Sequence, residues 1–400
     1  MIKKQQQLNE STQLFMDLYE GRVPKRVPIE LSINYEAAVL YAIENNKIKA
    51  DHELNLREVM WNNKLYKAVN ETVNEVIISD KAPIGMSARN PVFYQILESR
   101  CIKMSSSGYM QHPEVHSLEV NEYDQFISDP FKFMAEILMP RLYPALDCEP
   151  GRRAMIFSKA MAANTAETRA FAGAIREAGE KYGFAKIPAG RSTAPFDFLA
   201  DMLRSFSNIS SDIRRYSQKV LDACESITPL MVREGLGANP ANLPKYHRTF
   251  IPLHMGSFIS EKHFEKFYWP SFKKLMDELV APPVTGIGVD LFVEDNWMRH
   301  LDYMASLDGI VKMQFEYGDY QIIKDKFKNT KHIVTGLYPT GLLQFGTRQE
   351  CIDKAKELID IFAPGGKYVF GFDKSFFSLK EPILGNLRAV CEYVKDNAVY

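Results

Sequence analysis

Four charged side chains stand where apolar runs end in the last third of the sequence. His254 closes FIPLH, Glu294 closes VDLFVE, Glu316 closes VKMQFE and Asp373 closes YVFGFD. Imidazole and carboxyl groups are the types needed for general acid–base chemistry or for holding a metal ion. Burial next to apolar residues raises the pKa of a carboxyl group and suits it to proton donation. The pattern favours an enzyme.

Each of these runs, and also HIVTG (332–336), is followed by a helical pattern. Strands that alternate with helices indicate a parallel sheet. We therefore expect an α/β fold, specifically a (β/α)8 TIM barrel, in which active-site residues lie at the C-terminal ends of the strands. A helix is expected over residues 8–20, a first strand at Val27–Leu31, and a second strand at 74–79 after a helical stretch.

Residues 130–240 are predicted to be almost wholly helical. A helix opens at Asp129-Pro130, a longer one ends at Gly183, and two more are expected to part near Thr228-Pro229. This length exceeds one connection between barrel strands, so we expect a helical insertion or cap. The predicted organisation is one barrel domain over 1–400, with the insertion at about 130–240 and an N-terminal helical extension.

The composition excludes several classes of protein. The 400 residues are 46% hydrophobic and 12% aromatic, enough for a large core. A balance of 49 basic and 50 acidic residues gives no reason to expect nucleic acid or an anionic membrane as partner. Five scattered cysteines without a CxxC pair fit a reducing cytoplasm. Because we find neither a signal peptide nor a membrane-spanning run, we expect a soluble cytoplasmic protein.

The charged strand ends have structural explanations beside the functional ones. For Glu294 we favour a catalytic role, with the neighbouring Asp295 as a helix cap. His254 is equally open to either explanation. Glu316 is explained equally well as an acid or oxygen ligand and as the partner of a lysine. Asp373 stands beside Lys374, so a neutralised pair is its alternative.

Side chains next to these groups are candidates for lining a substrate pocket. Trp297, close to Glu294, is suited to contact a flat apolar ligand. Gln314 shares one face of its strand with Glu316, because side chains alternate along a strand. The predicted substrate contacts are Trp297, Met255, Gln314 and Asp373.

Several segments, in order along the chain, resemble the uroporphyrinogen decarboxylase superfamily, and more closely its methyltransferase branch. They include GRVPKRVPI, HSLEVNEYDQFISDP, APFDFLADMLRSFSNISSDI, SFISEKHFEKFYWPSFKKL and GLYPTGLLQFGTRQECIDKAKELID. The resemblance implies a (β/α)8 barrel with its site at the C-terminal mouth. True porphyrinogen decarboxylases of this family carry an arginine-rich, RQAGRY-like segment near the N-terminus. The corresponding stretch here reads RVPKRVPIEL, which disfavours that activity.

The resemblance also implies a choice of cofactors. Corrinoid-dependent methyltransferases of this fold hold zinc at the barrel mouth, and those acting on a thiol use a His-x-Cys pair and a later Cys. Here Gly256 follows His254-Met255, and Asp373-Lys374 stand near the later position, so a soft thiolate zinc site is disfavoured. Zinc would instead be held by His254, Glu294 and Glu316, as in members that resemble O-demethylases.

We predict a methyltransferase that moves a methyl group from a small methoxylated, aromatic compound to cobalamin, a corrinoid, carried by a separate protein. Zinc or a protonated carboxyl group would activate the leaving oxygen, with His254, Glu294 and Glu316 as the catalytic residues. One alternative is a tetrapyrrole decarboxylase, for which Arg22, Lys25 and Arg26 offer only a thin cationic set. The other is a barrel that binds without catalysis. A homodimer is left open.

Overall fold

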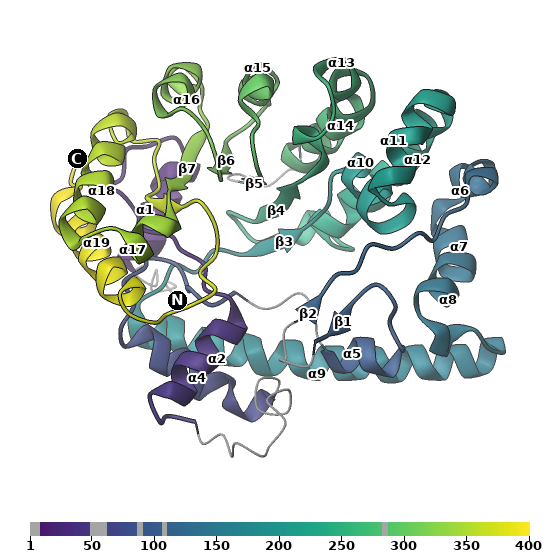
Figure 1. Ribbon diagram of the computed structural model, residues 1–400, viewed down its shortest axis with the longest axis horizontal. Helices are drawn as coiled ribbons and strands as arrows, with labels where there is room; N and C mark the ends of the chain where they lie inside the picture. The colour runs from purple at the N-terminus through teal and green to yellow at the C-terminus, as the bar shows by residue number, and fades with distance from the viewer. Residues whose placement is uncertain (1–8, 49–61, 86–90, 106–109, 282–286) are drawn as a thin grey trace, which may run out of the picture.

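A parallel sheet forms the centre of the computed structural model, which describes residues 9–48, 62–85, 91–105, 110–281 and 287–400 (Figure 1). Its strands follow one another in the order of the sequence, each parallel to the next. They are mostly apolar and buried, as expected when helices cover a parallel sheet. The strands are β3 (Ala189–Arg191), β4 (Arg248–Leu253), β5 (Gly288–Val293), β6 (Val311–Phe315), β7 (Ile333–Tyr338) and β8 (Gly371–Phe372).

Two extended segments close this sheet into a barrel. The segment around Glu30 lies beside β8, because Glu30 N donates a hydrogen bond to Phe370 O at 2.9 Å. The segment around Asp80 lies next to it, with Asp80 N donating to Ile29 O, and Asp80 O accepts from Ala185 N just before β3, both at 2.8 Å. Six strands and two segments complete a ring of eight, which confirms the predicted (β/α)8 barrel.

Helices follow the strands and surround the barrel (Figure 1). Within the described residues, none has the length and apolar character needed to cross a bilayer. The helices after successive barrel positions are α2 (Tyr35–Glu44), α4 (Tyr66–Asn74), α11 (Phe206–Arg215), α12 (Ser217–Leu236), α13 (Glu261–His263), α14 (Trp269–Val280), α15 (Leu301–Ala305), α16 (Tyr320–Phe327), α17 (Thr340–Phe345), α18 (Arg348–Phe362) and α19 (Ile383–Asn397).

The helical region at 130–240 is not one continuous insertion, because β3 lies inside it. Its first half belongs to the long connection that leads to β3, and its second half connects β3 to β4. Ala189–Arg191 carries no apolar strand pattern, so β3 was not predicted from the sequence. The first connection holds α5 (Pro91–Ile96), the β1–β2 pair (Lys103–Met104, Met110–Gln111), α6 (Tyr123–Ser128), α7 (Pro130–Phe133), α8 (Met139–Leu142) and α9 (Pro150–Tyr182).

One predicted helix end is confirmed and two predicted boundaries are wrong. Helix α9 ends at Gly183, which has a left-handed φ of 75°, as the sequence indicated. Pro229, however, lies inside α12, and the two helices part at Tyr216. Helix α4 runs to Asn74, so the second barrel segment begins later than the predicted 74–79. Tertiary packing outweighs the local helix-breaking signal of the proline.

The barrel interior near the N-terminal ends of the strands holds a buried ionic network. Lys312 forms ion pairs with Glu30 and with Asp290, the latter at 3.2 Å. Arg248 Nε donates to Asp290 Oδ1 at 2.9 Å, and its guanidinium lies 4.3 Å from the centre of the Tyr19 ring. Tyr19 ends α1 (Glu10–Tyr19), the predicted N-terminal helix. This helix therefore covers the N-terminal end of the barrel, opposite the end where the candidate residues stand.

Candidate active site at the C-terminal end of the barrel

Three of the predicted residues stand level at the ends of neighbouring strands. Leu253 pairs with Val293, and Val293 pairs with Phe315, in the register of β4, β5 and β6. His254, Glu294 and Glu316 are the next residues of these strands. Parallel strands in register bring their following residues to one edge, so the sequence placed these three groups together correctly.

His254 forms an ion pair that the sequence did not reveal. Its Nδ1 lies 3.0 Å from Oδ2 and 3.1 Å from Oδ1 of Asp201, on a helical turn in the β3–β4 connection. The hydrogen bond to this carboxylate raises the pKa of His254 to about 9, although partial burial opposes the shift. The imidazole is therefore cationic at neutral pH, with Nδ1–H donated to Asp201.

Asp197 holds the backbone of the turn formed by His254 and Met255. Its carboxyl accepts hydrogen bonds from His254 N at 3.1 Å, Met255 N at 2.9 Å and the Tyr268 hydroxyl at 2.8 Å. Complete burial, reinforced by the charge of Asp201, raises the pKa of Asp197 to about 7. The spacing of Asp197 and Asp201 in PFDFLAD, four residues apart on one helical face, was the available signal for both.

Glu294 presents a free carboxyl group between these ion-paired side chains. It is half-buried, and within the described part of the chain its side chain has neither a hydrogen bond nor an ion pair. Burial raises its pKa, and the negative charges of Glu316 and Asp201 add to this effect, whereas His254 opposes it. A carboxyl group with a raised pKa next to a cation is suited to donate a proton.

Glu316 holds the loop that carries Glu294. Its Oε1 accepts from Lys374 Nζ at 3.0 Å, and its Oε2 accepts from the backbone N of Asp295 at 2.8 Å. Asp295 has a positive φ of 61°, a costly conformation that this hydrogen bond helps to maintain. The structural explanation of Glu316 is thus present, because it pairs with a lysine. Asp295 belongs to a turn that Glu316 stabilises and is not a helix cap.

Asp373 and Gln314 mainly contact backbone groups. Asp373 Oδ1 accepts from Thr340 N at 3.0 Å and from Lys374 N at 2.8 Å, which ties the ends of β7 and β8 together. Gln314 Nε2 donates to Phe372 O at 3.0 Å. Since β7 separates β6 from β8, this bond reaches across the barrel interior. Both side chains lie at the mouth, in roles that stabilise it.

Trp297 and Met255 are placed in the core rather than on a ligand-facing wall. Trp297 has no exposed surface, and Met255 is 1% exposed. The indole packs edge-on against Phe264 and Tyr268 and donates from Nε1 to Glu294 O at 2.8 Å. The prediction that these two side chains contact substrate is therefore corrected. Large apolar groups beside a strand end gain more from joining the core than from facing the mouth.

The predicted zinc ligands do not form a binding set. In the described ranges, no three His, Cys, Asp or Glu side chains come together as a metal site. Both oxygens of Glu316 are engaged, one by the cationic Lys374, which would repel a metal ion. His254 and Glu294 leave too few donors for a closed zinc site. The zinc prediction stays without support from the donors present.

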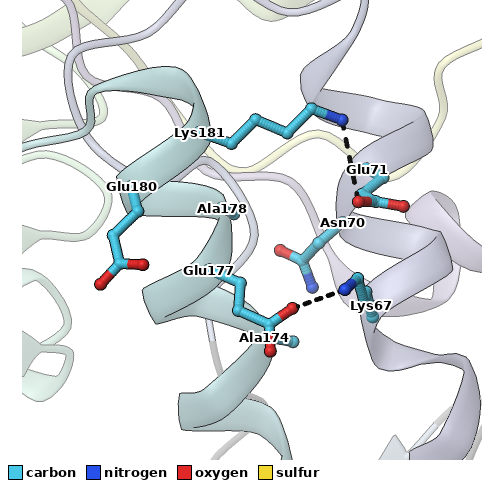
Figure 2. A pocket seen from close by; sticks show the side chains of 8 residues that line it. All are labelled: Lys67, Asn70, Glu71, Ala174, Glu177, Ala178, Glu180 and Lys181. Carbon is cyan, nitrogen blue, oxygen red and sulfur yellow. Dashed lines mark ion pairs between the residues drawn. The ribbon is translucent and has the colours of Figure 1, made fainter.

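A surface groove lies between α4 and α9 (Figure 2). Its volume is about 420 Å³, and ion pairs cross it at both ends, Lys67 with Glu177 at 2.8 Å and Lys181 with Glu71 at 3.7 Å. All of the residues that line it belong to these two helices, and none stands directly after a strand of the sheet. The groove is thus separate from the residues at the strand ends.

Comparisons with known proteins agree with this architecture. A methyltransferase from Methanosarcina mazei has the same fold, with a TM-score of 0.60 and 14% identity over 98% of this chain and 99% of that chain. A protein described as a vitamin-B12-independent methionine synthase from Listeria monocytogenes reaches a TM-score of only 0.41, at 12% identity over 93% of this chain and 96% of that chain.

No curated protein sequence matches the chain. The family model for uroporphyrinogen decarboxylase (URO-D) matches residues 158–396, more than half of the sequence. The chain belongs to the uroporphyrinogen decarboxylase family.

Proposed function

We propose that the protein is a methyltransferase that moves a methyl group from a small methoxylated, aromatic compound to a corrinoid carried by a separate protein. Membership of the family and the similarity to a methyltransferase of the same fold support the reaction class. The observation that carries the proposal is the free carboxyl group of Glu294 beside the cationic imidazole of His254.

Demethylation of an ether requires a proton for the oxygen that is left behind. The bond between the methyl carbon and oxygen breaks, the methyl group passes to the acceptor, and the oxygen would leave as an anion. Glu294 donates a proton to this oxygen, because burial raises its pKa and makes protonation easier than for an exposed glutamate. His254 stabilises the negative charge that develops. The corrinoid, when bound, supplies the nucleophile, and solvent returns a proton to Glu294.

The sequence predicted that either zinc or a protonated carboxyl group activates the leaving oxygen. The proposal uses the carboxyl group of Glu294 and assigns no step to zinc. Asp201 and Asp197 are positioning residues: the first orients the imidazole, and the second fixes the turn that carries it. Glu316, which follows the next strand, holds the Glu294 loop in the same way, and Lys374, which follows β8, holds Glu316.

The charges argue against a decarboxylase that binds an acidic tetrapyrrole. Arg22, Lys25 and Arg26 follow α1, at the end of the barrel away from the strand-end carboxyl groups, and each is paired with a carboxylate. At the mouth, His254 is paired with Asp201 and Lys374 with Glu316. The imidazole keeps one ring nitrogen, Nε2, for a single developing oxyanion, whereas a substrate with many carboxylates would meet no unpaired cation among these groups.

The test combines purified protein with a panel of methoxylated benzenes and reduced cobalamin, cob(I)alamin. We expect the absorbance of methylcobalamin to appear together with the demethylated phenol, detected by mass spectrometry. Without transfer from any member of the panel the proposal fails. Loss of carboxyl groups from uroporphyrinogen would then assign a decarboxylase, and inactivity in both assays would leave a binding barrel.

A further inference from the structure

Two large aromatic side chains are exposed beside His254. Phe258 is 52% exposed and Phe206 is 47% exposed, whereas just over half of the aromatic side chains among the described residues are buried. The ring of Phe258 lies edge-on to the imidazole of His254, with centres 5.5 Å apart, and edge-on to Phe206 at 5.8 Å. The three rings form a continuous row that comes from two different barrel connections. We call Phe206 and Phe258 the aromatic edge.

The backbone holds both members of the aromatic edge in place. Arg299 Nη2 donates to the carbonyls on either side of Phe258, at 2.6 Å to Ser257 O and 2.7 Å to Ile259 O. These charge-assisted bonds restrict the loop in which the exposed ring sits. Exposure of Phe258 therefore results from a fixed backbone and not from a loose loop.

Phe206 is fixed at a strained position. The preceding residue, Ser205, has a positive φ of 70°, which is costly for any residue other than glycine. Phe206 N donates to Glu114 Oε1 at 3.0 Å, so the start of α11 is anchored to a distant segment. Local strain and an exposed apolar ring are both unfavourable in the free protein, and together they indicate a binding role.

We propose that the aromatic edge binds the ring of the methyl donor, in the role that the sequence assigned to Trp297. This inference rests on the proposed function and names the residues that select an aromatic substrate. Both rings keep about half of their surface open to a flat ligand, and the row runs directly to His254. A small aromatic compound is favoured over a protein partner because the row is continuous with the imidazole that would stabilise its leaving oxygen.

The test measures binding by titration calorimetry in the absence of any corrinoid. The probes are methoxybenzene and methoxycyclohexane, which carry the same ether on a flat and on a saturated ring. We expect tighter binding of methoxybenzene, and a Kd raised about three- to tenfold in Phe258→Ala and in Phe206→Ala. Phe258→Tyr keeps an aromatic ring and should keep the affinity, which also controls for misfolding. Phe131→Ala, at an exposed phenylalanine on α7, should change nothing.

The inference is overturned by equal affinity for the two ethers, or by alanine variants that bind methoxybenzene as tightly as the unmodified protein. It is also overturned if the variants bind the ether normally and lose only transfer to cobalamin, because the edge would then serve the methyl acceptor. Selective binding that the variants weaken, with no methyl transfer in the unmodified protein, supports the aromatic edge while contradicting the proposed reaction.

Discussion

The imidazole of His254 and the carboxylate of Asp201 form an ion pair between the residue that follows β4 and a helical turn before α11. Oδ2 of Asp201 lies 3.0 Å from Nδ1, which leaves Nε2 as the ring nitrogen available to other groups. Asp201 thereby sets both the charge and the orientation of the histidine. A carboxylate from one connection thus controls a candidate catalytic group on the next.

Replacement Asp201→Asn should lower the pKa of His254 from about 9 towards the ordinary value of 6.5, because the hydrogen-bonded anion is the main cause of the shift. Titration of the imidazole by NMR measures it directly. The buried His300, whose pKa burial lowers to about 4, is an internal control that should not move. An unchanged titration of His254 would contradict the assigned ion pair.

The ion pair of His254 with Asp201 also predicts how the free energy of unfolding depends on pH. Since the pKa of His254 is higher in the folded state, its stabilising contribution is complete below about pH 6.5 and is lost as pH rises through about 9. The free energy of unfolding should therefore differ more between the unmodified protein and Asp201→Asn at pH 6 than at pH 9.5. Urea unfolding at the two pH values measures this difference, and an equal difference at both would show that His254 is not involved.

Glu294→Gln should lower the rate of methyl transfer by about 10²-fold or more, because a general acid typically contributes 10² to 10⁴. Binding of the methyl donor should persist, since the amide retains the shape of the side chain. In the unmodified protein the rate should fall as pH rises through the raised pKa of Glu294, and this fall should be absent from the residual activity of the variant.

Asp295→Asn is the matched control for Glu294→Gln. It removes an adjacent carboxylate, and asparagine tolerates the left-handed backbone at this position. Rates measured over a series of pH values should remain close to those of the unmodified protein. Unchanged activity of Glu294→Gln, or an equal loss in both variants, would remove Glu294 as the acid.

The sequence predicted the barrel because β4 to β8 are apolar runs with helices between them. It predicted the row of His254, Glu294 and Glu316 because each directly follows an apolar run and parallel strands end at one edge of the sheet. It did not predict Asp201, since an ion pair between two connections depends on tertiary geometry. Trp297 was misplaced for the same reason. Whether an aromatic beside a strand end faces the core or the mouth depends on the space left by its neighbours, and Gly256 provides that space.

Lys312→Met should reduce the free energy of unfolding by about 3–5 kcal/mol, because it leaves Glu30 and Asp290 buried without this partner. Both carboxyl groups have pKa values that are held below their ordinary range, chiefly by Lys312 against the effect of burial. Their stabilising contribution should therefore fall as pH is lowered. Chemical unfolding at pH 7 measures this loss in the free energy of unfolding.

Lys328→Met is the control, because it breaks an exposed pair with Asp325. It should cost no more than about 1 kcal/mol, and a similar cost for both variants would contradict the role of the network.

Gly256→Ala tests the packing that joins the core to the site. A Cβ at Gly256 would lie 2.4 Å from the Trp297 ring, which is fully buried and cannot move aside freely. We expect a loss of about 1–3 kcal/mol in the free energy of unfolding, the usual cost of overpacking. The indole also donates to Glu294 O, so a displaced ring should disturb the catalytic loop and lower the transfer rate as well.

Gly173→Ala in α9 is the control, because its Cβ would meet nothing within 4 Å, and a helical alanine should be neutral or stabilising. If Gly256→Ala were as stable and active as Gly173→Ala, Trp297 would not be the rigid support of the Glu294 loop.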